Sequence, residues 1–557
     1  MVRYLCLVLL LGLLSSAAFA GQSGGGSGQT PLAPPTASDD FVSAAVDAEP
    51  VEADGPLYPV TELTVRYFRE HPGLPAIDEL LDSEVALTLL PSGFVSPRGG
   101  EPTIKVRIGD VGSVGEPALY LSALNQITGE LVRKLNELDI IGVYAAPDLD
   151  QIDLNAGEDL RDPRDTSLEI IIYTGAVTDV RTIASGNRIP REERLNNPKH
   201  ARILRLSPIG AYDELAGDDE AERRDLIRRD KLDEFVLRLN RHPGRRVDVA
   251  LAPGERATEA VLDYLVAENR PWTIYAQASN TGTESTSDWR ERFGFQHTQL
   301  TNNDDILSID YITANFDAAH AVIGSYEFPI GDSEKLRGRV SGNYSDFTAS
   351  DVGITADVFE GEGYGLGGQL IYNIYQQRDF FIDFVGGIRW EEIEVFNSAV
   401  GVGSRENLFL GEIGLQAEQQ SELSQLDLGI SLEFNVPGIA GTGDEGLEGL
   451  GRLQPDERFQ VLRYSGGLTL YLDPIFGGAA WKDATTPKTS TLAHELELSF
   501  RGQWSLGNRL IPNAQQVVGG LFSVRGYPES VVSGDSAVVA TLEYRWHIPQ
   551  QINVGAA

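Results

Sequence analysis

Residues 519–527 read GGLFSVRGY and place Arg525 between two stretches that alternate like strands of a membrane barrel. The stretch before them, residues 492–504, carries its apolar side chains on one face, namely Leu496, Leu498, Phe500 and Trp504. Its other face is polar, and residues 537–548 repeat the pattern. Alternation with a period of two is the pattern of a strand with one apolar face. A sheet with one apolar face and one polar face could cover a soluble core. Many such strands in succession instead favour an outer-membrane barrel.

The first twenty residues have the pattern of a signal peptide. Residues 1–3 are a short basic start, residues 4–14 are apolar, and Ala18-Phe19-Ala20 is a small-residue cleavage site. The mature chain is therefore expected to begin near Gly21. Cys6, the single cysteine, lies in this peptide, so disulfides and thiolate catalysis are excluded from the mature chain.

Composition narrows the class of protein further. The formal net charge of -37 argues against a nucleic-acid partner, since phosphates require a basic surface. After the signal peptide there is no run of 18 or more apolar residues, which excludes a membrane-spanning helix. An exported protein of this kind is periplasmic, secreted or an outer-membrane barrel, and the alternation favours the barrel.

The region before the barrel is predicted to hold a linker and two α+β units. Residues 21–56 are rich in Gly, Ser and Pro and read as a flexible linker. The first unit, residues 57–190, has predicted strands at 60–68, 140–144, 168–173 and 177–183 and an amphipathic helix at 121–138. The second unit, residues 200–270, has predicted strands at 203–206, 247–251 and 259–268 and a helix at 231–240.

From residue 271 to residue 557 the pattern predicts strands only. We place twelve of them, at residues 272–280, 289–300, 305–314, 320–330, 336–346, 363–375, 380–393, 408–417, 424–434, 459–472, 492–504 and 537–548. Short polar turns alternate with long linkers, such as those at 349–362 and 436–457. This alternation indicates periplasmic turns at one end and external loops at the other. The segment of residues 474–488 is an exception, because it is too long for a periplasmic turn.

Three passages together resemble the haemolysin secretion/activation family, the two-partner secretion transporters of the Omp85 superfamily. Residues 127–147 are similar to the family's first POTRA domain, residues 239–254 to its second, and Val524-Arg525-Gly526-Tyr527 to the signature loop of the superfamily. Residues 270–272 and 280–284 resemble the entry into the barrel. The chain departs from the family in an insertion at residues 78–117 and in having no readable plug helix at residues 21–55.

The resemblance implies two periplasmic POTRA domains followed by an antiparallel β-barrel in the outer membrane. It implies a monomer, surrounded by lipid, that secretes a large unfolded exoprotein without ATP or a cofactor. Two alternatives remain open: an Omp85 factor that inserts other barrels, and a passive porin. The presence of only two POTRA-like units favours secretion. These units would lend a sheet edge to the extended client, or would serve only as a rigid spacer.

Val524, Arg525, Gly526 and Tyr527 are the predicted site residues. The resemblance implies that this loop folds into the lumen and that its arginine meets a carboxylate on a later strand. A guanidinium in a partly dehydrated lumen requires an acidic partner, and Gly526 allows a tight turn beside it. The alternative is an exposed hairpin tip with an ordinary arginine.

Other motifs do not predict an enzyme or a bound cofactor. Residues 363–368, GYGLGG, match a dinucleotide-binding pattern, but strand continues after them and no helix follows. The acidic residues 443–446 lack the spacing of an EF-hand. The seven histidines show no metal-ligand spacing, and the chain contains neither G-x-S-x-G nor H-E-x-x-H.

The strand count leads to one more expectation. The resemblance implies sixteen strands with the signature loop between the eleventh and the twelfth, which is where our count places Arg525. Only nine residues follow Ile548. We therefore expect the working protein to continue beyond Ala557, and the carboxylate that meets Arg525 to lie on a strand in that continuation.

Overall fold

The computed structural model describes residues 54–113, 118–154, 156–211, 226–255, 259–283, 286–352, 357–397, 402–421, 423–440, 444–477, 492–521 and 523–547. The predicted signal peptide and nearly all of the predicted linker lie outside these residues. The chain separates into two compact units, one holding residues 38–241 and 245–269, the other holding residues 242–244 and 270–557. The two units are described separately.

The first α+β unit is built on a three-stranded sheet. Its elements are β2 (Glu62–Tyr67), α2 (Ile77–Leu81), α3 (Leu121–Glu137), β7 (Val143–Pro147) and β10 (Ser167–Thr174). The strand order is β2-β10-β7, with β2 parallel to β10 and β7 antiparallel to it. The predicted helix at 121–138 is confirmed, because its buried residues Ile127, Leu131 and Leu135 recur at helical spacing.

The second unit repeats this topology with β11 (Ala176–Gly186), α4 (Ala201–Leu206), α6 (Arg229–Asn240), β12 (Arg245–Pro253) and β13 (Glu259–Glu268). Its strand order is β11-β13-β12, with β11 parallel to β13 and β12 antiparallel to it. The prediction of two α+β units in tandem is therefore confirmed. The strand predicted at 177–183 is β11, and it pairs in the second sheet rather than in the first.

The strand predicted at residues 203–206 is wrong, because these residues form helix α4. Pro198 occupies the first turn of the preceding 3-10 helix, and the side chain of Asn197 accepts a hydrogen bond from the backbone N–H of Lys199 at 3.0 Å. An Asn cap followed by Pro is a helix-start pattern. The helix then buries Ile203 in the core of the second unit.

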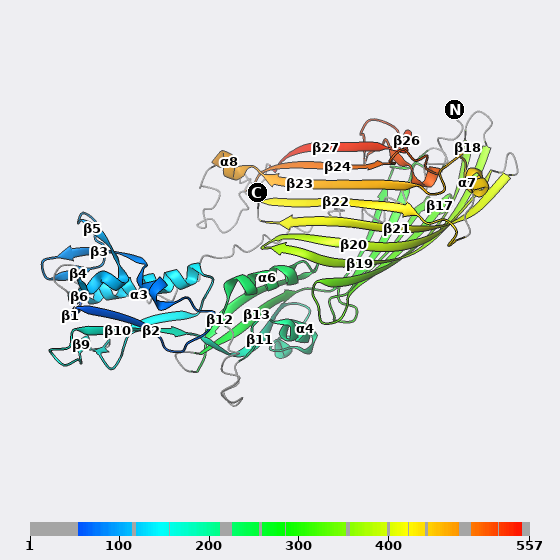
Figure 1. Cartoon of the computed structure of the whole chain (residues 1–557). Coiled ribbons are helices and arrows are strands. Elements are labelled where there is room, and N and C mark those ends of the chain that lie inside the picture. The colour runs from blue at the N-terminus through cyan, green and yellow to red at the C-terminus, as the bar shows by residue number, and fades with distance from the viewer. Residues whose placement is uncertain are drawn as a thin grey trace, which may run out of the picture. The chain divides into compact units, whose positions relative to one another are not determined.

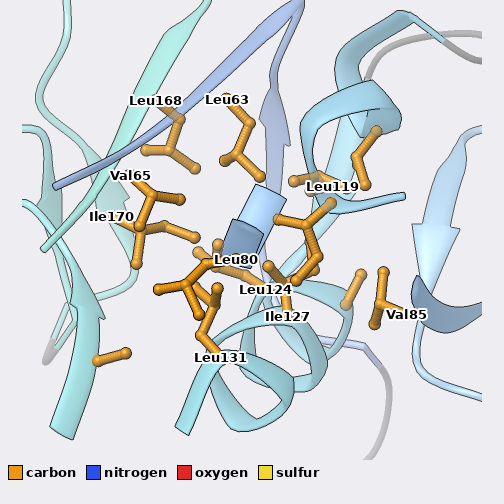
Figure 2. Close-up of a cluster of buried hydrophobic side chains, with 14 of the residues drawn as sticks. Leu63, Val65, Leu80, Val85, Leu119, Leu124, Ile127, Leu131, Leu168 and Ile170 are labelled. Carbon is orange, nitrogen blue, oxygen red and sulfur yellow. The ribbon is translucent and has the colours of Figure 1, made fainter. Parts of the chain in front are cut away.

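The insertion in the first unit forms a second sheet. Its strands are β1 (Leu57–Pro59), β3 (Glu84–Leu90), β4 (Gly93–Val95), β5 (Thr103–Arg107) and β6 (Ala118–Tyr120), in the order β1-β6-β4-β3-β5. Side chains from this sheet, such as Val85 and Leu119, and from the first sheet, such as Leu63 and Ile170, pack into one core with Leu124 and Ile127 of α3 (Figure 2). Sequence reasoning located the insertion but not this sheet.

Short elements complete the first unit and the start of the second. They are η1 (Ile108–Ser113), the pair β8 (Ile152–Asp153) and β9 (Glu158–Asp159), η2 (Arg191–Glu193) and η3 (Pro198–His200). Among the residues that the structure describes, no helix is long and apolar enough to cross a membrane.

Twelve antiparallel strands form the large sheet of the other unit (Figure 1). They are β14 (Trp272–Ser279), β15 (Arg290–His297), β16 (Ile306–Ala314), β17 (Ala319–Pro329), β18 (Leu336–Val352), β19 (Asp357–Gln377), β20 (Phe380–Asn397), β21 (Val402–Gln420), β22 (Ser424–Asn435), β23 (Gln460–Tyr471), β24 (His494–Trp504) and β27 (Ala537–Trp546). Each strand pairs with the next, so all twelve predicted strands are confirmed. Within the described residues, β14 and β27 are not paired with each other.

Two predicted linkers differ from expectation. Most of residues 349–362 is strand, because β18 and β19 pair as far as Val352 and Asp357. The linker at 436–457 contains the short helix α7 (Asp444–Gly449), and the long segment after β23 begins with α8 (Asp473–Gly477). Hairpin pairing can continue beyond the apolar part of a strand, where hydrophobic alternation no longer marks it.

The register of the last two strands confirms their two faces. Leu498 pairs with Leu542 on the apolar face, and Glu497 pairs with Glu543 on the polar face. Leu542 is 68% exposed on the apolar side. A row of exposed apolar side chains beside a polar row is the arrangement of a barrel wall between lipid and lumen.

Candidate functional site

The motif lies in the long connection between β24 and β27. After Trp504 the chain forms the 3-10 helix η5 (Pro512–Ala514) and a short hairpin of β25 (Gln516–Val518) and β26 (Val532–Gly534). Residues 519–531 make the tip of this hairpin. Val524, Arg525, Gly526 and Tyr527 are all exposed, while Phe522 lies outside the described residues.

Arg525 contacts a carboxylate on the polar face of the sheet. Its Nη2 donates a hydrogen bond to Oε1 of Glu543 on β27. Glu543 lies six residues after Ala537, where β27 begins, which corresponds to about 20 Å along a strand. The hairpin tip therefore reaches deep along the polar face from the end at which its loop leaves the sheet.

Within this chain the partner of Arg525 lies on the twelfth strand, which directly follows the loop. The carboxylate expected on a strand beyond residue 557 stays a prediction. Glu543 can meet Arg525 because strand alternation places its side chain on the polar face, at the level that the hairpin tip reaches. Alternation in the sequence had already placed Glu543 on that face, but not its contact with Arg525.

Glu543 belongs to a cluster of charges on β24 and β27. Arg545 lies 3.1 Å from Glu543, 2.7 Å from Glu495 and 2.5 Å from Glu497, measured between nitrogen and oxygen atoms. His547 lies 2.8 Å from Glu495. Arg525 itself is exposed over 64% of its side chain. An exposed ion pair of this kind is weak and reversible, so the tip contact can break without disturbing the sheet.

Asp535, at the base of the loop, is a candidate residue that sequence reasoning missed. Arg452, from the β22–β23 connection, binds its carboxylate through both terminal nitrogens, with Nη2 2.8 Å from Oδ2. Nε2 of Gln515 donates to Oδ1 at 2.8 Å. Partial burial alone would raise the pKa of Asp535, but the hydrogen bonds from Arg452 and Gln515 hold this pKa below its ordinary value. The two charged residues are 83 positions apart, so no local pattern connects them.

Gln503 joins the base of the loop to the sheet. This residue of β24 is 2% exposed, and its Nε2 donates to the carbonyl oxygens of Ala514 at 3.0 Å and Asp535 at 2.9 Å. Its Oε1 accepts a hydrogen bond from Arg463 of β23 at 3.2 Å. Both ends of the hairpin are thereby fixed to one wall side chain.

A belt of paired charges continues from this point across the polar face. Glu433 of β22 binds Arg463 at 2.9 Å on one side and Arg389 of β20 at 3.0 Å on the other. Glu433 is 5% exposed. A buried carboxylate requires such partners, since an unpaired charge in this position is costly. The buried charge of Glu433 is thus compensated by arginines from two other strands of the sheet.

An apolar cluster covers one end of the polar face. The cluster joins side chains of the wall, of the β22–β23 connection that contains α7, and of the motif-bearing loop. Its members are Ile393, Val395, Leu408, Leu410 and Val461 of the wall, Leu447, Leu450 and Phe459 of the connection, and Leu510, Ile511 and Ala514 of the loop. Leu447, Leu450 and Leu510 are fully buried. The two long connections, β22–β23 and β24–β27, therefore pack together at this end of the sheet.

Gly520→Ala is expected to loosen the hairpin tip. Gly520 has φ +90°, and a Cβ there would lie 2.0 Å from the carboxyl group of Glu529, which accepts a hydrogen bond from the N–H of Leu521. Holding an alanine at this positive φ costs about 1–2 kcal/mol before any contact is counted. Limited proteolysis of the folded protein should cut the tip faster in this variant.

Gly526→Ala is the matched control, because Gly526 also has positive φ (+87°) but no atom lies within 4 Å of its Cβ position. Equal cleavage rates for the two variants would contradict a steric role for Gly520.

The sequence of this chain is similar to those of known proteins. The family model described as "Haemolysin secretion/activation protein ShlB/FhaC/HecB" matches residues 259–556. The heme/hemopexin transporter protein HuxB of Haemophilus influenzae is 20% identical over 340 residues, which cover 58% of this chain and 54% of that protein. The chain thus spans about half the length of the curated relatives it matches.

Two solved structures share the fold. CdiB from Escherichia coli has a TM-score of 0.53 at 16% identity, covering 90% of this chain and 78% of that one. CdiB from Acinetobacter baumannii has a TM-score of 0.50 at 15% identity, covering 98% of this chain and 85% of that one. These matches extend over both the α+β units and the large sheet.

Proposed function

Because the chain belongs to the haemolysin secretion/activation family, we propose that it is an outer-membrane transporter that secretes a large partner exoprotein. The α+β units are POTRA domains in the periplasm, and the strands lie in the outer membrane. The client crosses in extended form and needs neither a nucleotide nor a cofactor bound to this chain. The observation that carries the proposal is the contact between Arg525 of the motif and Glu543 on the polar face.

The contact supports transport because it holds a movable hairpin across the polar side of the wall. The base of the hairpin is fixed by several hydrogen bonds, whereas the described residues of its tip bond to the wall through the exposed Arg525–Glu543 pair, with Glu529 also attracted by Arg290 of β15. A client entering the lumen must displace the tip, and the paired charges of the wall give it a hydrated surface without a strong binding site.

Co-expression with a client tests the proposal. The client is the product of a neighbouring open reading frame that encodes a long exported β-helical protein. We expect the client to become sensitive to external protease only when this chain is present, and to cross-link to residues on the polar face. Steady passage of small solutes without any client cross-link would instead establish a porin.

A further inference from the structure

In the part of the loop that the structure describes, the hydrogen bonds at the tip and at the base differ in strength. At its tip, Arg525 makes one contact with Glu543, and the arginine is largely exposed. At its base, the Asp535 carboxylate is bound by Arg452, by the side chain of Gln515 and by the N–H of Leu510 at 3.3 Å. Both contacts are charge-assisted, but the pair at the base is two-pronged, which also fixes orientation. The side chain of Arg452 is only 21% exposed, against 64% for Arg525.

The base is tied to a second external connection as well as to the wall. Arg452 Nη1 also donates to the carbonyl oxygen of Leu510 at 2.5 Å. Arg509 Nε donates to the carbonyl oxygen of Leu453 at 2.7 Å, and the N–H of Asp456 donates to the carbonyl oxygen of Arg509 at 2.8 Å. Five residues, three from the β22–β23 connection and two from the loop base, thus form a small interlocked unit beside the apolar cluster.

We infer that Asp535, held by Arg452, is the positioning residue that keeps the motif-bearing loop inside the lumen, while the Arg525 contact at the tip is the one released during transport. This inference rests on the proposed function, since it assigns the fixed and the moving part of the same loop. The hairpin would pivot about residues 514 and 535, the two positions that Gln503 holds.

A single reporter cysteine measures the position of the tip without any client. The mature chain is expected to contain no cysteine, so Pro528→Cys creates a unique thiol at an exposed position next to the motif. The rate at which a bulky, membrane-impermeant maleimide labels this thiol on intact cells reports how often the tip leaves the lumen. Heat-modifiability on gels shows that each variant is assembled.

Asp535→Asn and Arg452→Gln are each expected to raise the labelling rate by about tenfold or more, the effect of losing a charge-assisted hydrogen bond. Arg452→Lys should restore slow labelling in part, because a lysine keeps the charge but not the fork. Glu543→Gln should raise the rate less than either base variant. Arg405→Gln is the control, since Arg405 forms an equally exposed pair with Glu394 on the wall.

Two results would overturn the inference: unchanged labelling in the Arg452→Gln variant, or a larger increase with Glu543→Gln than with either base variant. Arg452 lies outside the strands, so its replacement keeps the test informative if Asp535→Asn fails to assemble. Since no client is present, a labelling change in a protein that exports nothing would support the positioning role and refute the proposed function alone.

Discussion

Replacing Arg525 with alanine is expected to abolish surface export of the client while the barrel still assembles. The contact with Glu543 is exposed, and exposed ion pairs contribute little to stability. Removing it therefore costs the fold little. A loss of export would then come from the position of the motif in the lumen, not from unfolding. The measurements are protease-accessible client on intact cells and heat-modifiability of the barrel.

Three further variants sharpen the test of Arg525. Glu543→Gln should reproduce the loss, because it removes the charge that Arg525 meets. Arg525→Lys should rescue export poorly, since an ammonium lacks the planar donor geometry of a guanidinium. Arg405→Ala, which breaks a comparable pair with Glu394, should leave export unchanged. Full export by the Arg525→Ala variant would show that the contact is incidental, and full rescue by lysine would show that charge alone is required.

Binding of an extended client to the POTRA domains is expected to weaken by about tenfold when proline replaces Val249 on β12. Proline has no N–H to donate to the client, and its ring disturbs the pairing of the edge strand. β12 is an edge strand of the second sheet. The side chain of Asn240 bonds the N–H and the carbonyl of Val247, at 2.6 Å and 2.9 Å. The backbone groups of Val247 therefore point away from β13. Alternate residues of a strand share an edge, so those of Val249 do too.

The experiment uses purified residues 54–269, which hold both α+β sheets, and an unfolded amino-terminal piece of the client. Val249→Ala is the matched control, since it shortens the side chain but keeps the N–H. Circular dichroism and thermal unfolding check that the proline variant remains folded. Affinity that falls equally in the alanine and proline variants would mean that the side chain, and not the strand edge, binds the client. The rigid-spacer alternative predicts no binding at all.

Part of this protein could be read from local pattern. The twelve strands follow from alternation, since one face of each must suit lipid and the other water, and this constraint acts on every second residue regardless of distant contacts. Helix α3 was readable for a similar reason, because its buried residues recur at helical spacing. The motif and its position between the eleventh and twelfth strands were likewise visible in the chain, as was the polar face that carries Glu543.

Tertiary structure decided the remainder. Residues 203–206 have the composition of a strand, yet the capped turn before them and the burial of Ile203 make them a helix. The insertion became part of a sheet because its strand β4 pairs with β6, and β6 pairs in turn with β1, where Leu57 lies opposite Tyr120. The partners that hold the loop, Arg452 and Asp535, are 83 residues apart. Alternation determines which face a side chain occupies, but only the folding back of two separate connections onto one wall brings such side chains within bonding distance.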